Sequence, residues 1–465
     1  MDTLNAKPIL EYEFSGEAGP EKRLGFQYLD FSVPESSCTL EVEYDYKGLG
    51  PGEVTIDIGL FEPGEIELAE GMKSFRGWSG STKRKFYVSR AWATPGYLPG
   101  DVKPGTWKVI LGFYKIPERG VAYSVRVRVY RECFDASKKP NVVEKRKSYR
   151  GWVKGDLHMH SVHSDGDSTL YEIAELAHSM GLDFVSVTDH NTVSQIAELD
   201  WSSAYINNVL FIRGVEVTTY KGHMNVYGAS EVPDFRLSTR ADLERIVSYL
   251  KSKNFFLSVN HPKPLGPDWE FGDMSFADAV EVFHSVWEFN NHVSLRKWDE
   301  LLQKGLRIGL IGGSDAHEMK GKASLLLPGV PTTWVYVDEL SEPGVLAGLR
   351  SQKVFVSESV QGPKLFLKAF SGGREYGLGE TIDSGDVKLA VQVEGAEGQY
   401  LRLISQGEVI ATEKVNSGIF ARKFNLNMKG AYVRAEVLKE VADLGDPYHP
   451  DNIISVLSSP IYLNI

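Results

Sequence analysis

Cysteine is scarce in this chain, and two kinds of segment are missing from it. The 465 residues include two cysteines, Cys38 and Cys133. They are too few for a disulfide framework and have no metal-binding spacing, although a single bridge between them is possible. No run of about 18 apolar residues occurs, and no basic segment followed by an apolar one begins the chain. We therefore expect a cytoplasmic protein without membrane association.

Basic residues are outnumbered by acidic ones. The chain has 51 Lys and Arg residues against 62 Asp and Glu residues, which gives a formal net charge of −11. Nucleic acids and anionic membranes attract basic surfaces, so this balance argues against broad affinity for either. We expect a small-molecule partner, and an anionic one would have to be held by a local site. The oligomeric state is not indicated.

The first third of the chain has the texture of β-structure. The stretches "CTLEVEYDY", "EVTIDIGLF", "WKVILGFYKI" and "AYSVRVRVY" are rich in β-branched and aromatic residues, and Gly/Pro-rich turns separate them. This pattern predicts an N-terminal β-sandwich domain over residues 1–148. Residues 138–154 then hold seven basic side chains against one acidic one, which is typical of a solvated linker, although a role in steering substrates is the alternative.

After residue 154 short apolar runs alternate with amphipathic helices. "TLYEIAELAHSMG" places apolar residues on one face, has Thr169 and Glu172 as a capping box, and ends at Gly181. "RADLERIVSYLKSK" and "SLRKWDELLQKG" repeat the pattern between strand-like runs. This alternation predicts a parallel sheet or barrel over residues 149–361. Strand-like runs return in residues 362–465 and predict a C-terminal β-sandwich domain.

Histidine is concentrated in the central segment. Ten of the eleven histidines lie between residues 149 and 361. Many of them, and several carboxylates, follow predicted strands at their carboxyl ends, where the active sites of parallel α/β folds are built. We expect these side chains to meet in space: His158, His160, Asp165, His190, Glu216, His261, Asp315 and His317.

Two pairs in this set have the same spacing. His158 and His160 flank Met159, and Asp315 and His317 flank Ala316. Side chains of an extended strand alternate with a period of two, so the members of each pair point the same way. Imidazole and carboxylate are good ligands for borderline divalent metals, and the sequence therefore predicts a metal site.

The motifs that carry these residues resemble those of the PHP (polymerase and histidinol phosphatase) superfamily. "DLHMHSVHSDG", "VTDHNT", "GVEVT", "NHP" and "GGSDAH" occur in the family's order over residues 155–318. Outside this segment, "GWSGS", "ATPGYLPG", "PGTWKVILGFY" and "PIYL" are similar to the carbaryl-hydrolase-like (CehA/McbA) branch. The resemblance implies a multidomain chain in which two β-sandwiches flank a distorted seven-stranded, TIM-like (β/α) barrel with a two- or three-metal centre.

The resemblance also implies a role for each ligand. His158, His160 and Asp315 would bind one metal, and Asp165, His190 and His317 a second. Glu216 would bridge the two. His261 and His223 would complete a third site, although His223 could instead be a strand-end residue bonded to a backbone carbonyl. Manganese, iron and zinc all suit this mixture of nitrogen and oxygen ligands.

A few neighbouring residues have two interpretations. Lys263 could hold an anionic substrate, or it could face water in a loop. His163 is either a loop residue without a role or a proton donor, and His284 is a candidate substrate contact. Asp189 is expected to orient a neighbouring group.

We predict a metal-dependent hydrolase. Divalent metals lower the pKa of bound water, so a metal-bridging hydroxide can attack without a protein nucleophile. A phosphoesterase is the first hypothesis, because a positively charged centre favours an anionic ester. A carbamate, ester or amide hydrolase with the same centre is the alternative, and a catalytically inert glycan- or protein-binding module is a third.

Overall fold

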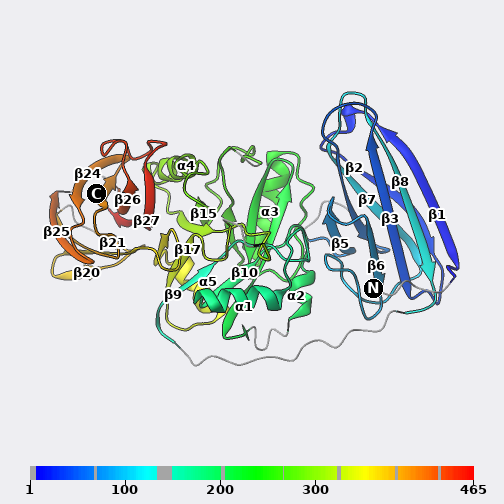
Figure 1. Cartoon of the computed structure of the whole chain (residues 1–465), viewed down its shortest axis with the longest axis horizontal. Helices are drawn as coiled ribbons and strands as arrows, with labels where there is room; N and C mark the ends of the chain where they lie inside the picture. The colour runs from blue at the N-terminus through cyan, green and yellow to red at the C-terminus, as the bar shows by residue number, and fades with distance from the viewer. Residues whose placement is uncertain are drawn as a thin grey trace.

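A computed structural model of the chain contains three groups of elements, which follow one another along the long axis of the molecule (Figure 1). The structure describes residues 7–66, 71–133, 149–199, 205–264, 267–321, 326–382, 386–427 and 431–464. Residues 138–148 of the predicted linker lie outside these ranges. Within the described ranges, no helix has the length and apolar character needed to cross a membrane.

The N-terminal group consists of two antiparallel sheets with strand orders β1-β8-β3-β6 and β2-β7-β4-β5. Apolar residues of both sheets, such as Val42 of β3 and Val109 of β7, share one core, so the two sheets pack face to face. Cys38 and Cys133 form a disulfide. The elements are β1 (Leu10–Ala18), η1 (Pro20–Lys22), β2 (Phe26–Val33), β3 (Thr39–Gly48), β4 (Thr55–Phe61), β5 (Phe75–Gly80), β6 (Lys85–Ser89), β7 (Gly105–Lys115) and β8 (Val121–Tyr130).

The central group carries the predicted helices and the strand ends with the histidines. The capping box of Thr169 and Glu172 and the left-handed Gly181 bound the first helix as expected. The elements are β9 (Gly151–Asp156), α1 (Leu170–Met180), β10 (Phe184–Val187), α2 (Ser194–Glu198), β11 (Tyr205–Ile206), β12 (Val209–Thr219), β13 (Gly222–Tyr227), α3 (Arg240–Ser252), β14 (Phe256–Val259), β15 (Ala279–His284), α4 (Asn291–Gln303), β16 (Gly309–Gly313), β17 (Thr332–Val337), α5 (Glu342–Arg350) and β18 (Val354–Ser357).

The expectation of a parallel central sheet is wrong at several strands. β11 is antiparallel to β12, and β17 is antiparallel to both β9 and β18. β13 runs antiparallel to both of its neighbours, β12 and β14, whereas the pairs β9–β10, β10–β12, β14–β15 and β15–β16 are parallel. The reason is the short connection between β12 and β13, residues 220–221, which can only form a hairpin. The amino end of β13 therefore lies beside the carboxyl ends of the other strands.

The strands that the resemblance assigns to a barrel form one continuous ladder, ordered β16-β15-β14-β13-β12-β10-β9. Just beyond the ends of β9 and β16, the two outermost strands of this ladder, a single isolated parallel bridge connects Met159 and Ala316. The sheet continues past β9 into β17 and β18, so the ladder is not a closed ring. The closed seven-stranded barrel stays a prediction.

The C-terminal group shares a sheet with the central group. Strand β18 pairs with β27, which extends the central sheet through β26 and β23 to β24. A separate sheet, β20-β19-β22-β25, shares a core with these strands. The predicted boundary near residue 361 thus falls within one hydrogen-bonded sheet. The elements are β19 (Lys364–Ser371), β20 (Arg374–Tyr376), β21 (Thr381–Ile382), β22 (Asp386–Glu394), β23 (Tyr400–Ser405), β24 (Glu408–Lys414), β25 (Ile419–Asn427), β26 (Tyr432–Glu440), β27 (Ile453–Ser458) and β28 (Ile461–Leu463).

Candidate metal centre

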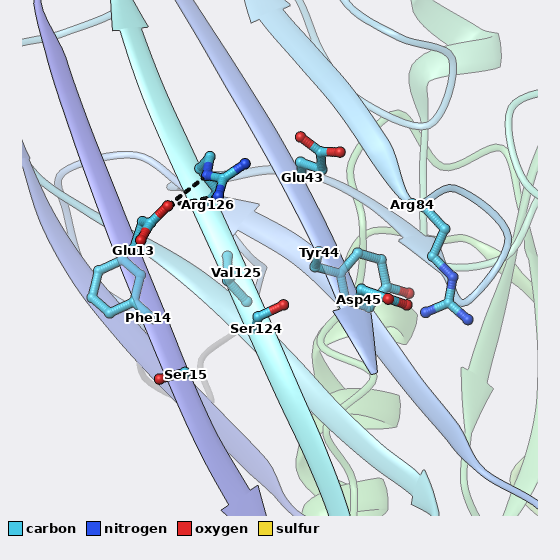
Figure 2. Close-up of a pocket in the computed structure, with 10 residues that line it drawn as sticks. All are labelled: Glu13, Phe14, Ser15, Glu43, Tyr44, Asp45, Arg84, Ser124, Val125 and Arg126. Atoms are coloured by element: carbon cyan, nitrogen blue, oxygen red, sulfur yellow. Dashed lines mark hydrogen bonds and ion pairs between the residues drawn. The ribbon is translucent and has the colours of Figure 1, made fainter. Parts of the chain in front are cut away.

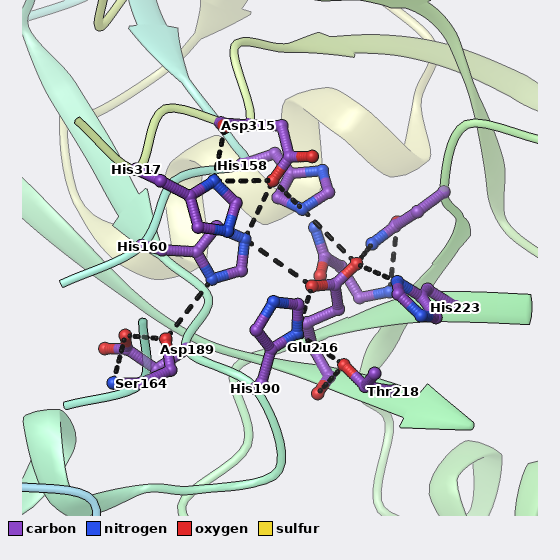
Figure 3. Close-up of polar contacts among 12 residues, drawn as sticks. His158, His160, Ser164, Asp189, His190, Glu216, Thr218, His223, Asp315 and His317 are labelled. Carbon is purple, nitrogen blue, oxygen red and sulfur yellow. Dashed lines mark hydrogen bonds and ion pairs between the residues drawn. The ribbon is translucent and has the colours of Figure 1, made fainter. Parts of the chain in front are cut away.

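The structure brings the nine predicted ligands together. Potential ligand atoms of these residues form groups in which all atoms lie within 4.8 Å of one another. Figure 3 shows the imidazoles converging on the carboxylates from several segments. The groups are His160–Asp165–His190–His317, His158–His261–Asp315, His158–His160–Glu216 and His190–Glu216–His223, and a further one joins His261, Glu281 and His284.

Alternation along the backbone explains how His158 and His160, on either side of the bridged Met159, both reach the cluster. Met159 and Ala316, the residues between the paired ligands, are both fully buried in a core on the opposite side. Asp315 and His261 have φ angles of +54° and +27°. Such left-handed conformations are uncommon for residues other than glycine and are held in place by the surrounding contacts.

Glu216 occupies the middle of the cluster. Its carboxylate is fully buried, and imidazole nitrogens surround both oxygens. The nitrogen–oxygen distances are 3.3 Å to His158, 3.5 Å to His160, 2.8 Å to His190, 3.1 Å to His223 and 3.6 Å to His261. One carboxylate that faces five imidazoles is the arrangement expected of a bridging ligand.

Two further carboxylates extend the cluster to either side. Asp315 lies 2.9 Å from His160 and 3.1 Å from His284. Asp165 lies 3.3 Å from His317 and 3.5 Å from His190. The cluster therefore offers carboxylate and imidazole ligands in several overlapping sets rather than one isolated site.

The charges of these groups shift one another's pKa values. Burial lowers the pKa of His160 to about 4, and the nearby His317 and His190 contribute to this effect. His190 is also buried, but Asp165 and Glu216 raise its pKa to about 10. Burial opposes ionisation of Glu216, yet His158, His190 and other imidazoles hold its pKa well below the ordinary value. Imidazoles with raised pKa values, such as His190, thus lie beside carboxylates with lowered ones, such as Glu216.

Several buried atoms of the cluster have no hydrogen-bond partner within the described part of the chain. They are His158 Nε2, His160 Nε2, Glu216 Oε2 and Asp315 Oδ1. An unsatisfied buried polar atom is costly, and a cation bound among these four atoms would remove that cost. The residues present therefore fit divalent metal ions, as the sequence predicts; their role as ligands stays a prediction.

Glu281 is a member of the cluster that the sequence analysis missed. It is fully buried in β15, lies 2.8 Å from His158 Nδ1, and accepts a hydrogen bond from the backbone of His261. A carboxylate on the second nitrogen of a metal-binding imidazole fixes the orientation of the ring. The available signal was an acidic residue in the middle of the buried strand "AVEVFH", because a buried charge requires a partner.

Other polar residues support the loops around the cluster. Asp189 accepts hydrogen bonds from the backbone and hydroxyl groups of Ser161 and Ser164, which agrees with its predicted orienting role. Asn260 donates to Glu216 Oε1 over 2.8 Å. These contacts hold the ligand loops without adding ligands of their own.

The three candidate substrate residues have different positions. His284 lies at the cluster, beside Asp315. His163 instead points to helix α2, where its ring nitrogens contact Ser194 and Glu198. Lys263 is buried and donates to Asn291 Oδ1 over 2.7 Å, so the interpretation as a water-facing lysine is wrong. Burial lowers the pKa of Lys263 to about 7.

A pocket of about 200 Å³ opens beside the cluster. Asp165, His190 and His223 line one side, and residues of the N-terminal sheets, including Asp57 and Trp78, line the other. The N-terminal group thus supplies part of the wall around the candidate centre.

A second pocket, of about 380 Å³, lies on strands β1, β3 and β8 of the N-terminal group (Figure 2). Among its lining residues, Glu13 pairs with Arg126 over 2.6 Å, and Arg84 lies over the ring of Tyr44. None of the predicted site residues lines it, and its charged groups make the contacts of an ordinary solvent-facing sheet.

Comparisons with known proteins gave short or distant similarities. No protein-family model matches the chain. A stretch of 80 residues is 34% identical to the DNA polymerase/3'-5' exonuclease PolX of Bacillus subtilis (strain 168) and covers 14% of this chain and 14% of that protein. This chain thus matches only a small part of the length of PolX.

Two solved structures are similar over larger regions. One is a two-domain protein from Bacteroides vulgatus ATCC 8482, described as containing a predicted PHP-like metal-dependent phosphoesterase; identity is 16%, the TM-score is 0.38, and 71% of this chain and 100% of that chain are covered. The other is an amidohydrolase from Chromobacterium violaceum, with 16% identity, a TM-score of 0.26, and coverage of 35% and 87%. These names describe the relatives, and a function for this chain rests on its own residues.

Proposed function

We propose that this protein is a metal-dependent phosphoesterase whose centre holds two or three divalent ions. The observation that carries the proposal is the convergence of nine histidine and acidic residues, four of whose buried atoms have no hydrogen-bond partner in the described part of the chain. Metal binding is the chemistry that best explains such a set. The resemblance of the motifs to the PHP superfamily supports the same conclusion.

The arrangement suggests which side chains hold the ions. Glu216 would be shared between neighbouring ions, because both of its oxygens face several imidazoles. His160, Asp165, His190 and His317 form the largest ligand group. Manganese, iron and zinc all suit these ligands.

Each part of the chain then has a task in the reaction. Bound divalent ions lower the pKa of coordinated water and stabilise charge that develops on a phosphoryl group. Glu281 and Asn260 orient His158 and Glu216. Trp78 and the neighbouring N-terminal residues enclose the pocket and limit access of bulk water.

The net charge of the metal-loaded centre would favour an anionic substrate. Three divalent ions against the three predicted ligand carboxylates would leave a formal charge of about +3, and Glu281 would lower it by one. Such a centre stabilises the extra negative charge of a phosphoryl-transfer transition state. We accordingly propose a small anionic ester as the substrate of this chain.

The decisive experiment combines metal analysis with a substrate panel. Protein purified without chelator should contain divalent metal and hydrolyse p-nitrophenyl phosphate or bis-p-nitrophenyl phosphate. Chelation should abolish turnover, and Mn²⁺ or Zn²⁺ should restore it. His190→Ala should lose activity, whereas His178→Ala, which replaces an exposed histidine of α1, serves as the matched control.

Three results would contradict the proposal. Activity that survives exhaustive chelation would exclude metal chemistry. An aryl carbamate with a kcat/KM more than about tenfold above that of the phosphoesters would favour the carbamate hydrolase. Metal-loaded protein without hydrolytic activity on any substrate would favour the binding module.

A further inference from the structure

The outer face of one N-terminal sheet lies against the candidate centre. In β4, Ile56, Ile58 and Leu60 point into the sandwich core. Side chains of a strand alternate, so Asp57 and Phe61 point to the other face, and Phe61 belongs to the core shared with the central group. Asp57 is therefore placed at the junction between the N-terminal sheet and the centre.

Asp57 is a buried carboxylate that, among the residues described by the structure, accepts a side-chain hydrogen bond only from a hydroxyl group. Tyr220, at the turn between β12 and β13, donates to Asp57 Oδ2 over 2.7 Å. Asp57 is 9% exposed, and no Lys, Arg or His within the described ranges forms an ion pair with it. A buried carboxylate normally has a cationic partner, because desolvation of an unpaired charge is costly.

The position of Tyr220 is determined by the sheet beneath it. Gly112 of β7 pairs with Phe26 on one side and with Asp57 on the other, so these three residues form a row across the sheet. A Cβ atom at Gly112 would collide with the hydroxyl group of Tyr220. The Tyr220 ring also stacks on Phe26 and Tyr114, with centroid distances of 5.5 and 5.0 Å. Because Gly112 has no side chain, the hydroxyl group of Tyr220 can reach Asp57.

Asp57 and the metal ligands share one cavity. The pocket of about 200 Å³ is lined by Asp57, Trp78 and Tyr114 on one side and by His190 and Asp165 on the other. A substrate whose phosphoryl group lies at the ligand cluster would therefore extend its alcohol portion toward Asp57. The lining there includes the aromatic rings of Trp78, Tyr114 and Tyr220, and a cation is attracted to the face of an aromatic ring.

We propose that Asp57 binds a positively charged amine in the alcohol portion of the phosphoester substrate, with Trp78 and Tyr114 as the aromatic walls of this subsite. The inference rests on the proposed phosphoesterase function and adds a substrate class to it. Tyr220 is a positioning residue, because its hydroxyl occupies Oδ2 and holds the carboxylate in place. The partner that Asp57 lacks in the protein is then supplied by the substrate.

Two phosphomonoesters of almost equal shape test this subsite. Phosphocholine carries a trimethylammonium group, and 3,3-dimethylbutyl phosphate carries a neutral tert-butyl group in its place. The metal-loaded protein should prefer phosphocholine by at least about tenfold in kcat/KM. Asp57→Asn should reduce this preference at least about tenfold, whereas Asp30→Asn, the same change at an exposed carboxylate of β2, should leave it unchanged.

A binding measurement that needs no turnover completes the test. Choline should bind the metal-free protein, by calorimetry, at least about tenfold more tightly than it binds Asp57→Asn. Equal kcat/KM values for the two esters, or choline binding that is the same in both proteins, would overturn the subsite. If p-nitrophenyl phosphate is hydrolysed without any preference for phosphocholine, only the subsite fails. If no phosphoester is hydrolysed, the proposed function fails as well.

Discussion

At the scale of single residues, Glu216 and Glu281 illustrate two uses of a buried carboxylate. Both are fully buried, but Glu216 faces five imidazoles while Glu281 contacts the far nitrogen of His158. We expect Glu216→Gln to reduce both metal content and kcat/KM by more than 100-fold, because it removes a shared ligand. Glu281→Gln should cost roughly 10–100-fold, as is typical of residues that orient a ligand. Metal analysis and kinetics of both variants would show this order, and the reverse order would contradict the assignment.

Asp57 has a predictable effect on stability as well. Burial raises its pKa to about 6, although Tyr220 and His190 oppose the shift. The folded state therefore binds this proton more tightly than the unfolded state, and stability is lost as the pH rises from about 4 through 6. Tyr44, Asp165 and His223 are the other titratable groups nearby.

Replacement of Asp57 by asparagine should therefore stabilise the folded protein, but only at pH values above about 6, where the carboxylate of the wild type is charged. We expect Asp57→Asn to raise the free energy of unfolding of the metal-free protein by about 1–3 kcal/mol at pH 8, with little change at pH 4. Thermal unfolding at the two pH values measures the difference. An equal effect at both would show that the charge of Asp57 is not the cause.

At the scale of elements, helix α3 shows how local sequence determines a boundary. Thr239 accepts a hydrogen bond from the backbone of Asp242, and Asp242 accepts one from the backbone of Thr239. Leu243, Ile246 and Leu250 then pack into the central core. The helix therefore begins where its first free N–H groups are satisfied.

Removal of the N-terminal cap should destabilise α3 without affecting the hydrolytic activity. Thr239→Ala is expected to cost about 1 kcal/mol, which corresponds to roughly fivefold faster amide exchange in the helix. Thr239→Ser keeps the accepting oxygen and should exchange like the wild type. Hydrogen exchange of residues 240–252 is the measurement, and equal rates in the two variants would exclude a contribution from the cap.

At the scale of the whole molecule, a buried charge network connects the C-terminal group to the central one. Arg434 of β26 donates to Asp299 of α4 over 2.7 Å, and it also pairs with Glu436. Arg402 of β23 pairs with the same Glu436, and none of these four side chains is exposed. Tyr432 adds a hydrogen bond to Asp299 over 2.8 Å. Two guanidinium groups against two carboxylates leave the network neutral.

Loss of one carboxylate from this network should be severe. Asp299→Asn leaves a guanidinium charge uncompensated in the interior, and we expect a loss of about 3–5 kcal/mol in the free energy of unfolding. Glu375→Gln, which disrupts an exposed pair with Lys368, should cost less than about 1 kcal/mol. Denaturant unfolding followed by tryptophan fluorescence compares the two. Similar small losses would show that the network does not hold the groups together.

The sequence by itself determined those features that depend on neighbouring residues. The HxH spacing places His158 and His160 on one side of the chain, because side chains alternate along extended backbone. The capping boxes and strand patterns likewise depend on contacts within a few positions. The elements, and the residues that meet in the cluster, could therefore be predicted without the tertiary structure, whereas their role as ligands stays a prediction.

Only the tertiary structure decided how distant segments meet. Asp57 and Tyr220 are 163 positions apart, and no local pattern relates them. The contact between Glu281 and His158 and the sheet that runs unbroken into the C-terminal group also arise from packing. A buried charge needs a partner, but the sequence does not say which one, because the choice depends on the faces that the folded sheets bring together.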